Sequence, residues 1–147
     1  MQAKDYFQFI VDEIHTVIVA TTDDNALPVT CAVDMMDFDE SSLYFLTARG
    51  KNFYDRLKKN AYISLTGIKG EDTMSRVAVS VRGKVKELGA GKVKELFDKN
   101  PYMYEIYPDE ASQERISVFR LYEGTGNWFD LSKKPIFTAS FSFGRKN

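Results

Sequence analysis

The sequence contains very little cysteine and histidine, and this scarcity removes several classes of functional site. Of its 147 residues, one is cysteine (Cys31) and one is histidine (His15). A single cysteine cannot form a disulfide within the chain, and the two residues are too few for a metal or iron–sulfur centre with several such ligands. A serine–histidine relay is equally disfavoured. Such sparing use of cysteine is typical of a reducing cytoplasm.

Long hydrophobic runs and an excess of either charge are also missing. The chain carries 20 basic and 21 acidic side chains, for a formal net charge of −1, and this balance gives no electrostatic reason to expect nucleic-acid binding. No apolar stretch approaches the length of a membrane span, and the first residues, with Lys4 and Asp5, do not resemble a signal peptide. We therefore expect a cytoplasmic protein that binds neither a membrane nor nucleic acid.

The residues that are present suffice for one packed domain. Hydrophobic residues make up 44% of the chain and aromatic residues 14%, which is enough for a substantial core. Linkers, internal repeats and low-complexity tracts are absent from the sequence. We therefore expect a single domain over residues 1–147.

Short runs of β-branched and aromatic residues, joined by turn signals, predict a mainly β fold. Strands are expected over residues 16–22, 28–33, 42–48, 61–69, 75–88 and 116–122, and helices over residues 3–14, 51–59 and 91–100. Residues 101–115 are expected to be short helical or irregular structure, and residues 124–126 a turn. Because the connections are short, neighbouring strands should pair antiparallel, which indicates a small barrel flanked by helices.

Two details of this pattern concern packing. Val77, Val79 and Val81 alternate with polar residues, and Gly83 then interrupts the run, which predicts a bulge or bend there. The final segment, residues 137–144, is apolar at alternate positions. We expect it to pack against the body of the protein.

The segment from Ser42 to Leu57 holds the clearest functional signal. A strand ends at Thr47, the chain turns at Gly50, and a helix follows. Two cations, Arg49 and Lys51, stand at the start of that helix, where the helix dipole repels positive charge and favours an anion such as phosphate. Solvated loop charges are the alternative interpretation. The residues of the turn by themselves favour neither.

This segment, with the strand of residues 60–66 after it, resembles the pyridoxamine 5'-phosphate oxidase-like FMN-binding split-barrel family, in its general stress protein-like branch. The shared order is a short hairpin, an aromatic strand ending in threonine, a basic turn, a helix ending in leucine, and the motif Asn60–Leu65. The resemblance covers roughly residues 5–88. It implies an antiparallel six- to seven-stranded split β-barrel with flanking helices, and FMN as the cofactor.

The resemblance also implies which residues contact the flavin. Arg49 and Lys51 would bind the phosphate, since the family's Ser-Arg-Lys triplet falls on residues 51–53 and only Lys51 is charged there. Trp128 would approach the flavin from a partner subunit, with a core tryptophan as the alternative. The full set of candidate cofactor-binding residues is Val29, Thr30, Cys31, Ala32, Leu46, Thr47, Ala48, Arg49, Lys51 and Trp128. No metal site is expected, and no catalytic residue is assigned.

The function implied is an FMN-dependent oxidoreductase that passes electrons from a reduced nicotinamide or another donor to a small-molecule acceptor. A non-catalytic FMN-binding stress-associated carrier or sensor is the alternative. Pyridoxamine-phosphate oxidation itself is disfavoured, because the chain after residue 116 holds Arg120 and Arg145 but no histidine. Haem binding would rest on His15 alone. The family's flavin site implies a homodimer with the flavin at its interface, and any iron–sulfur partner would be a separate chain.

Overall fold

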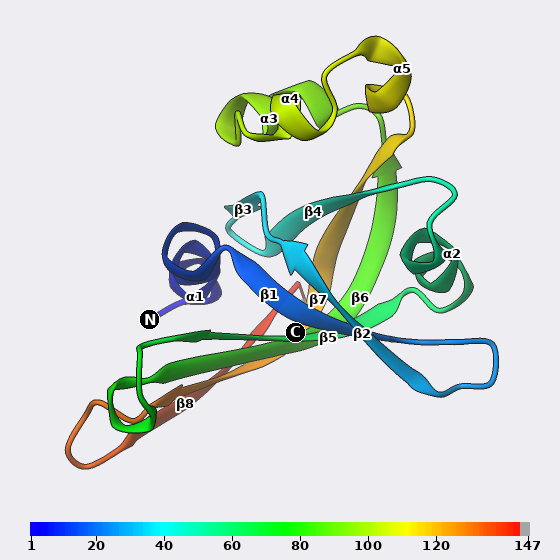
Figure 1. The fold of residues 1–147 in the computed structure, drawn as a ribbon. Coiled ribbons are helices and arrows are strands. Elements are labelled where there is room, and N and C mark those ends of the chain that lie inside the picture. The colour runs from blue at the N-terminus through cyan, green and yellow to red at the C-terminus, as the bar shows by residue number, and fades with distance from the viewer. Residues whose placement is uncertain (145–147) are drawn as a thin grey trace.

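Eight β-strands form one antiparallel sheet that does not close on itself (Figure 1). The computed structural model describes residues 1–144. Along the sheet the strands follow the order β2-β1-β5-β6-β7-β4-β3, and β8 also pairs with β7. The strands are β1 (Thr16–Thr22), β2 (Pro28–Asp34), β3 (Asp37–Asp39), β4 (Ser42–Ala48), β5 (Tyr62–Lys69), β6 (Val77–Gly89), β7 (Ile116–Asp130) and β8 (Phe137–Phe143).

The two longest strands, β6 and β7, join two halves of the sheet. Residues 116–121 of β7 pair with β4, whereas residues 124–130 pair with β8. Between these segments the sheet divides, which gives the open, split form of a barrel. The predicted mainly β, antiparallel split-barrel fold is therefore confirmed, and the short strand β3 is an addition that the sequence did not indicate.

The turn expected at residues 124–126 is wrong, because β7 runs through it unbroken. Gly124 lies opposite Gly83 of β6. A Cβ atom on Gly126 would lie 2.2 Å from the ring of Phe141 on β8. These glycines permit close approach of the neighbouring strands, and glycine inside a strand has this use as often as it marks a turn. The bend predicted at Gly83 is present as a shift in register between Lys84 and Val85.

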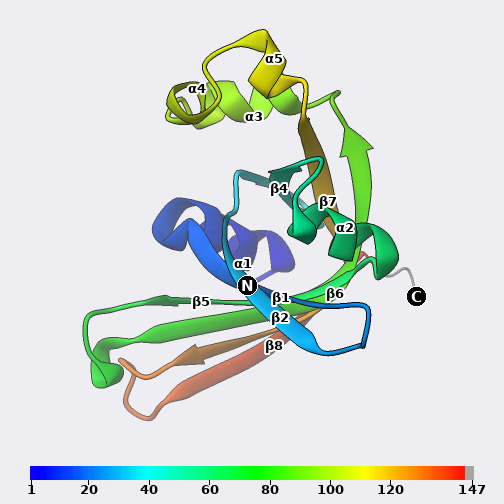
Figure 2. The ribbon, with the colours of Figure 1, turned by 45° about the vertical axis from the view of Figure 1, so that its right-hand side comes forward.

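Helices occupy three places around the sheet (Figure 2). The first helix and α2 lie on one side of the β5–β6–β8 region, and three short helices gather beyond one end of β6 and β7. No helix of residues 1–144 covers the other side of that region. The helices are α1 (Ala3–Phe9), which continues as the π-helical turn η1 (Ile10–Ile14), α2 (Asn52–Lys59), the 3-10 turn η2 (Thr73–Ser75), α3 (Val93–Lys99), α4 (Met103–Ile106) and α5 (Glu110–Gln113).

The core has two parts. The larger packs α1 and α2 on the inner face of the sheet, and it includes Phe7, Phe45 and Phe119, each almost wholly buried. Burying one such side chain contributes about 1.5–3 kcal/mol. The smaller part lies under α3 and α4, with Phe97 and Met103 at its centre. Both parts are filled from strands far apart in sequence, so the core holds the sheet and the helices together.

The last strand packs as its alternating pattern predicts. The ring of Phe141 stacks on Tyr6 of α1 at a centroid distance of 4.3 Å, and Phe143 meets Phe7 edge to face at 4.9 Å. Because α1 is the first element and β8 the last, these contacts bring the two ends of the chain together.

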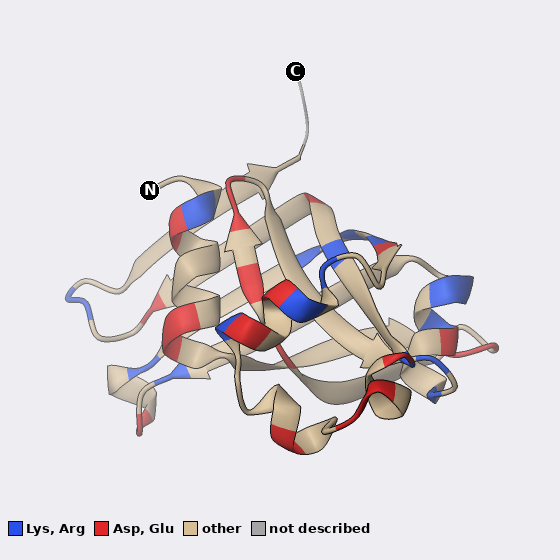
Figure 3. Ribbon diagram, turned by 90° about the horizontal axis from the view of Figure 1, so that it is seen from above, with Lys and Arg blue, Asp and Glu red and all other residues tan. Residues whose placement is uncertain are grey.

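Acidic and basic residues are interspersed over the visible helices and strands (Figure 3). Many pair across elements, as Lys69 does with Glu13 and Lys99 does with Asp37. Within residues 1–144 the chain forms no helix of the length and apolarity needed to cross a membrane.

Candidate functional site

A cavity of about 410 Å³ lies between β2, the end of β4, the beginning of α2 and the short helix α4. Its volume falls within the range of about 300–1,000 Å³ that is typical of small-molecule pockets. Half of the predicted cofactor-binding residues line it together, namely Cys31, Ala32, Leu46, Thr47 and Lys51. Strands β2 and β4 therefore converge on one cavity.

The turn after β4 creates an open helix end at this cavity. Gly50 has a φ of 93°, a value that favours glycine. Lys51 then serves as the N-cap residue of α2, and no side-chain hydrogen bond caps that end of the helix. The first backbone N–H groups of α2, from Asn52 onward, thus lack intrahelical partners. Free N–H donors beside an ammonium group form a site for an anion.

Apolar side chains form a large part of the remaining lining. Phe53 of α2 and Met103 of α4 are buried, whereas Ile106 of α4 is 59% exposed. Leu46 of β4 adds to the same lining. The cavity thus has a cationic end at α2 and an apolar side, an arrangement that suits a planar ring carrying a phosphate tail.

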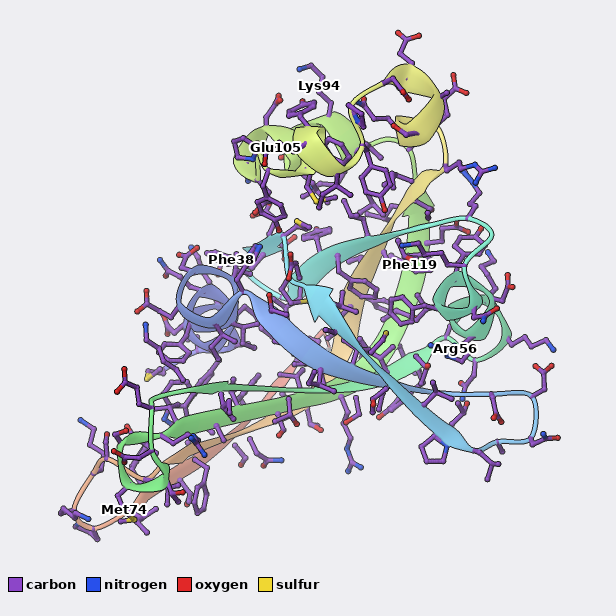
Figure 4. The ribbon with its side chains drawn as sticks, viewed as in Figure 1. Phe38, Arg56, Met74, Lys94, Glu105 and Phe119 are labelled. Carbon is purple, nitrogen blue, oxygen red and sulfur yellow. The ribbon has the colours of Figure 1, made fainter. Side chains whose placement is uncertain are left out.

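Arg56 is a cation near this cavity that the sequence interpretation missed. Its Nε donates a hydrogen bond of 2.7 Å to Oγ1 of Thr21 on β1, and Figure 4 shows it on the side of α2 that faces β1 and β2. Burial raises the pKa of the Cys31 thiol, and Arg56 and Lys51 partly offset that rise. Helical spacing in the sequence could have identified it, since Arg56 follows Phe53 by three residues and therefore lies on the same face of α2.

The remaining predicted residues do not line this cavity. Arg49 is exposed and turns away toward α5, where its Nη1 lies 3.5 Å from the carbonyl oxygen of Glu114. Ala48 is buried in the smaller part of the core. Val29 and Thr30 lie further along β2, toward the β1–β2 hairpin.

Trp128 lies in β7 and is 8% exposed. Its indole packs on Tyr6 and Phe9 of α1, with ring centroids 5.4 Å and 4.9 Å away. In the sheet it is opposite Ala139 of β8. Within one chain it therefore belongs to the core beneath α1 and does not line the cavity between β2 and α4.

A second polar group at the cavity was not foreseen. The carboxylate of Asp34, at the end of β2, accepts hydrogen bonds from Thr16 at 2.5 Å and from Tyr102 at 2.8 Å. Nε2 of His15 lies 2.6 Å from the same tyrosine oxygen. Burial, followed by the hydrogen bond to Asp34, raises the pKa of Tyr102. The sequence held no signal for this cluster, because Asp34 and Tyr102 are 68 residues apart.

His15 lies at the end of η1, where its ring meets a backbone carbonyl. Its Nδ1 lies 3.2 Å from the carbonyl oxygen of Val11, one of the free carbonyls at the end of η1. Among residues 1–144, no group of three or more histidine, cysteine or acidic side chains is placed to hold a metal ion. Arg120 donates from Nε to Ser42 at 2.6 Å, and Arg145 lies outside the described residues.

A larger hollow of about 660 Å³ lies between α2 and the β1–β2 hairpin. Its lining is mostly charged, and part of that charge is neutralised by the ion pair of Lys59 with Asp24. It lacks the apolar wall found beside Phe53. The cavity between β2 and α4 is therefore the better candidate site.

Comparison with known proteins identifies relatives of this fold. The family model described as pyridoxamine 5'-phosphate oxidase matches residues 3–130. No curated protein sequence matches the chain.

Several solved structures share the fold at low sequence identity. A NimC/NimA family protein from Clostridium acetobutylicum superposes with a TM-score of 0.75 at 16% identity, covering 94% of each chain. A protein from the same organism, related to general stress protein 26 of B. subtilis, gives 0.70 at 19% identity, covering 95% of each chain. An FMN-binding, pyridoxamine 5'-phosphate oxidase-related protein from Nostoc punctiforme gives 0.63 at 10% identity, covering 96% of this chain and 94% of its own.

Proposed function

The chain belongs to the pyridoxamine 5'-phosphate oxidase family, and from that premise we propose that it is an FMN-dependent oxidoreductase, which passes electrons from a reduced nicotinamide or another donor to a small-molecule acceptor. The observation that carries the proposal is the uncapped beginning of α2, with Lys51 as N-cap, opening into a cavity with an apolar wall. The FMN-binding protein from Nostoc punctiforme, which shares the fold, supports the choice of cofactor.

The donor set of the cavity fits FMN. The ammonium of Lys51, the hydroxyl of Thr47 and the N–H groups that begin α2 would hold the phosphate. Leu46 and Phe53 would contact the apolar face of the ring system, and β2 at Cys31–Ala32 would present backbone groups to its polar edge. When bound, the flavin supplies the electron transfer, and the chain binds it, orients it and excludes water.

We extend the proposal to a homodimer with the flavin at its interface. The outward positions of β1, β5 and β7, where burial alternates along each strand, expose Ile18, Tyr62 and Phe129, which are 50%, 45% and 44% accessible. Apolar side chains on a flat sheet face favour contact with another protein surface, and a two-fold dimer is the commonest assembly. Light scattering should give twice the chain mass of 16.8 kDa.

Flavin titration tests the cofactor assignment. Purified protein should bind FMN and quench its fluorescence, and it should bind riboflavin, which lacks the phosphate, much more weakly. Lys51→Gln should weaken FMN binding by about 1–3 kcal/mol, the scale for a hydrogen bond to a charged group, but should leave riboflavin binding unchanged. Lys94→Gln, on α3 away from the cavity (Figure 4), is the control. Arg49→Gln tests the second cation that the sequence assigned. Equal affinities of wild type and Lys51→Gln would overturn the phosphate site.

Anaerobic mixing with NADH or NADPH then separates the enzyme from the carrier. Bleaching of the bound flavin within seconds, followed by its return when an acceptor is added, supports an oxidoreductase. The carrier or sensor is supported instead if the protein retains FMN but the bound flavin is not reduced within seconds. This must hold for both nicotinamides and for chemical one-electron donors.

A further inference from the structure

The segment that joins η1 to β1 has an unusual backbone. The helix widens into a π-helical turn at Ile10–Ile14, and the N–H of His15 donates to the carbonyl of Ile10 at 2.6 Å. His15 itself has a φ of 70° and a ψ of −64°, and a positive φ is strained for a residue other than glycine. Widened helical turns and strained residues concentrate at functional sites. This backbone conformation directs the imidazole of His15 toward Tyr102, the residue that precedes α4.

The hydrogen bonds at Tyr102 have a defined direction. The Tyr102 hydroxyl has one proton, and a carboxylate can only accept. That proton points at Oδ2 of Asp34, 2.8 Å away, and when Nε2 of His15 carries a proton it donates to the tyrosine oxygen at 2.6 Å. The three groups form a continuous donor chain from His15 through Tyr102 to Asp34. His15 and Asp34 are each about 30% exposed, so this series of hydrogen bonds begins and ends at accessible groups.

The Asp34 end of this series of hydrogen bonds faces the cavity. Asp34 and Thr16 line it, whereas His15 and Tyr102 stand behind them and do not. Along β2, Asp34 is three residues from Cys31, which is about 10 Å at 3.3 Å per residue. Cys31 lies within the electrostatic reach of Lys51 and Arg56. The cavity thus has its cations at one end and a hydrogen-bonded carboxylate at the other, where a phosphate tail would not lie.

We propose that Asp34 exchanges a proton with the substrate held in this cavity, and that Tyr102 and His15 position its carboxyl and connect it to solvent. The proposal rests on the proposed function, and it specifies the substrate as an acceptor, such as a quinone, that takes up a proton as it is reduced. A bound reduced flavin would supply a hydride, which carries two electrons and one proton, so that the single further proton comes from Asp34. In the relay, the proton on Nε2 of a protonated His15 moves to the Tyr102 oxygen while the Tyr102 proton moves to Asp34. His15 and Asp34 are both left neutral, and Asp34 gives its proton to the acceptor.

Other charged groups near the relay already have partners. Asp34, Tyr102 and His15 contact one another. On the segment before His15, Glu13 pairs with Lys69 at 2.9 Å. After Asp34, Asp37 pairs with Lys99 at 2.8 Å. The relay is therefore the group of hydrogen-bonded titratable side chains at this end of the cavity.

The single histidine makes the relay directly observable without flavin. Because His15 is the only histidine, its ring N–H signals in ¹⁵N NMR have no competing resonance. In wild type the Nε2 proton should be present and protected from exchange. Tyr102→Phe should speed its exchange at least tenfold. Tyr104→Phe is a matched control, since Tyr104 also donates to a carboxylate, Asp98 at 2.6 Å, but away from the cavity.

Asp34→Asn tests the proton transfer, because asparagine keeps the size and the acceptor oxygen but cannot take up a proton. FMN-loaded protein is photoreduced and mixed with menadione at pH 6–9. We expect wild type to be reoxidised at a nearly constant rate. Asp34→Asn should be at least tenfold slower at pH 8 and should gain about tenfold in rate for each unit of falling pH, as solvent becomes the proton source. Asp98→Asn should behave as wild type.

The outcomes are separable. The relay is overturned if Asp34→Asn matches the wild-type pH profile with equal FMN affinity, or if Tyr102→Phe leaves the exchange of the His15 ring proton unchanged. If Tyr102→Phe does not fold, Asp34→Asn answers the same question through the same ring proton, whose exchange should then also accelerate. Failure of wild type to bind FMN would instead remove the proposed function, and with it the role of Asp34 toward an acceptor, whatever the NMR shows.

Discussion

Gly83 of β6 and Gly124 of β7 lie directly opposite each other, so closely that a Cβ atom on either would stand 2.0 Å from a backbone oxygen of the facing strand. Side chains cannot be accommodated at that distance without moving the backbone. The register shift between Lys84 and Val85 follows immediately. The pair thus lies beside the irregularity in the pairing of β6 with β7, the two strands that join the halves of the sheet.

We expect Gly83→Ala to lower the free energy of unfolding by about 2–4 kcal/mol, because the obstacle is backbone that cannot rotate away. Gly91→Ala is the matched control, since nothing lies within 4 Å of its Cβ position. That change should stay within about 0.5 kcal/mol of wild type. Urea denaturation measures both. Equal stability of the two variants would mean that the strands are not this close in solution.

The contact of Phe7 with Phe143 should be measurable as a coupling. Their rings meet edge to face at 4.9 Å, and both are buried. A double-mutant cycle with Phe7→Leu and Phe143→Leu should give about 0.5–1.5 kcal/mol of coupling. Phe137→Leu, on the same strand but 48% exposed, should change stability little. Additive effects of the two core substitutions would show that α1 and β8 do not stabilise each other.

Glu87 should make the stability of the protein acid-sensitive. It accepts hydrogen bonds from Lys58 at 2.7 Å, Ser117 at 2.6 Å and Tyr54 at 2.8 Å. Burial by itself raises its pKa, but these bonds outweigh burial and lower the pKa to about 2. Since the folded value lies below the unfolded value of about 4.5, the stabilisation is complete above pH 4.5 and is lost as the pH falls toward 2.

Accordingly, Glu87→Gln should cost about 1–3 kcal/mol at pH 7, and the gap to wild type should narrow steadily between pH 4.5 and pH 2. Denaturant unfolding across that range provides the measurement. Glu105→Gln, at an exposed position of α4, should show no such pH dependence. A gap that stays constant with pH would contradict the hydrogen-bonded carboxylate.

The alkylation rate of the Cys31 thiol can show whether the cavity is occupied. Burial raises the pKa of its thiol, and only the thiolate reacts with alkylating reagents. Iodoacetamide should therefore react slowly at pH 7 and about tenfold faster per unit of rising pH below that pKa. Saturating FMN should slow the reaction at least tenfold, whereas the same concentration of inorganic phosphate should slow it much less. If saturating FMN leaves the alkylation rate unchanged, the flavin does not bind in this cavity.

Much of the fold could be predicted because it is local. Alternation marks the buried face of β6 at Val79 and Val81, and the strand–turn–helix around Gly50 could be located from residue types alone. The failure at Gly124–Gly126 has a physical reason, since a glycine required by a neighbouring ring cannot be told from a glycine required by a turn until the neighbour is known. The same reason applies to Trp128, whose aromatic partners on α1 precede it by more than 100 residues.

The sequence by itself determined most of the strands, the basic turn before α2 and the absence of cysteine and histidine clusters, because periodicity, turn chemistry and composition act over a few residues. Only the tertiary structure decided which cations reach the cavity, Lys51 rather than Arg49 within one chain, and that Asp34, Tyr102 and His15 meet. Side chains from distant segments become neighbours through strand register and helix packing, and these follow from the burial of the whole core, which no short stretch of sequence encodes.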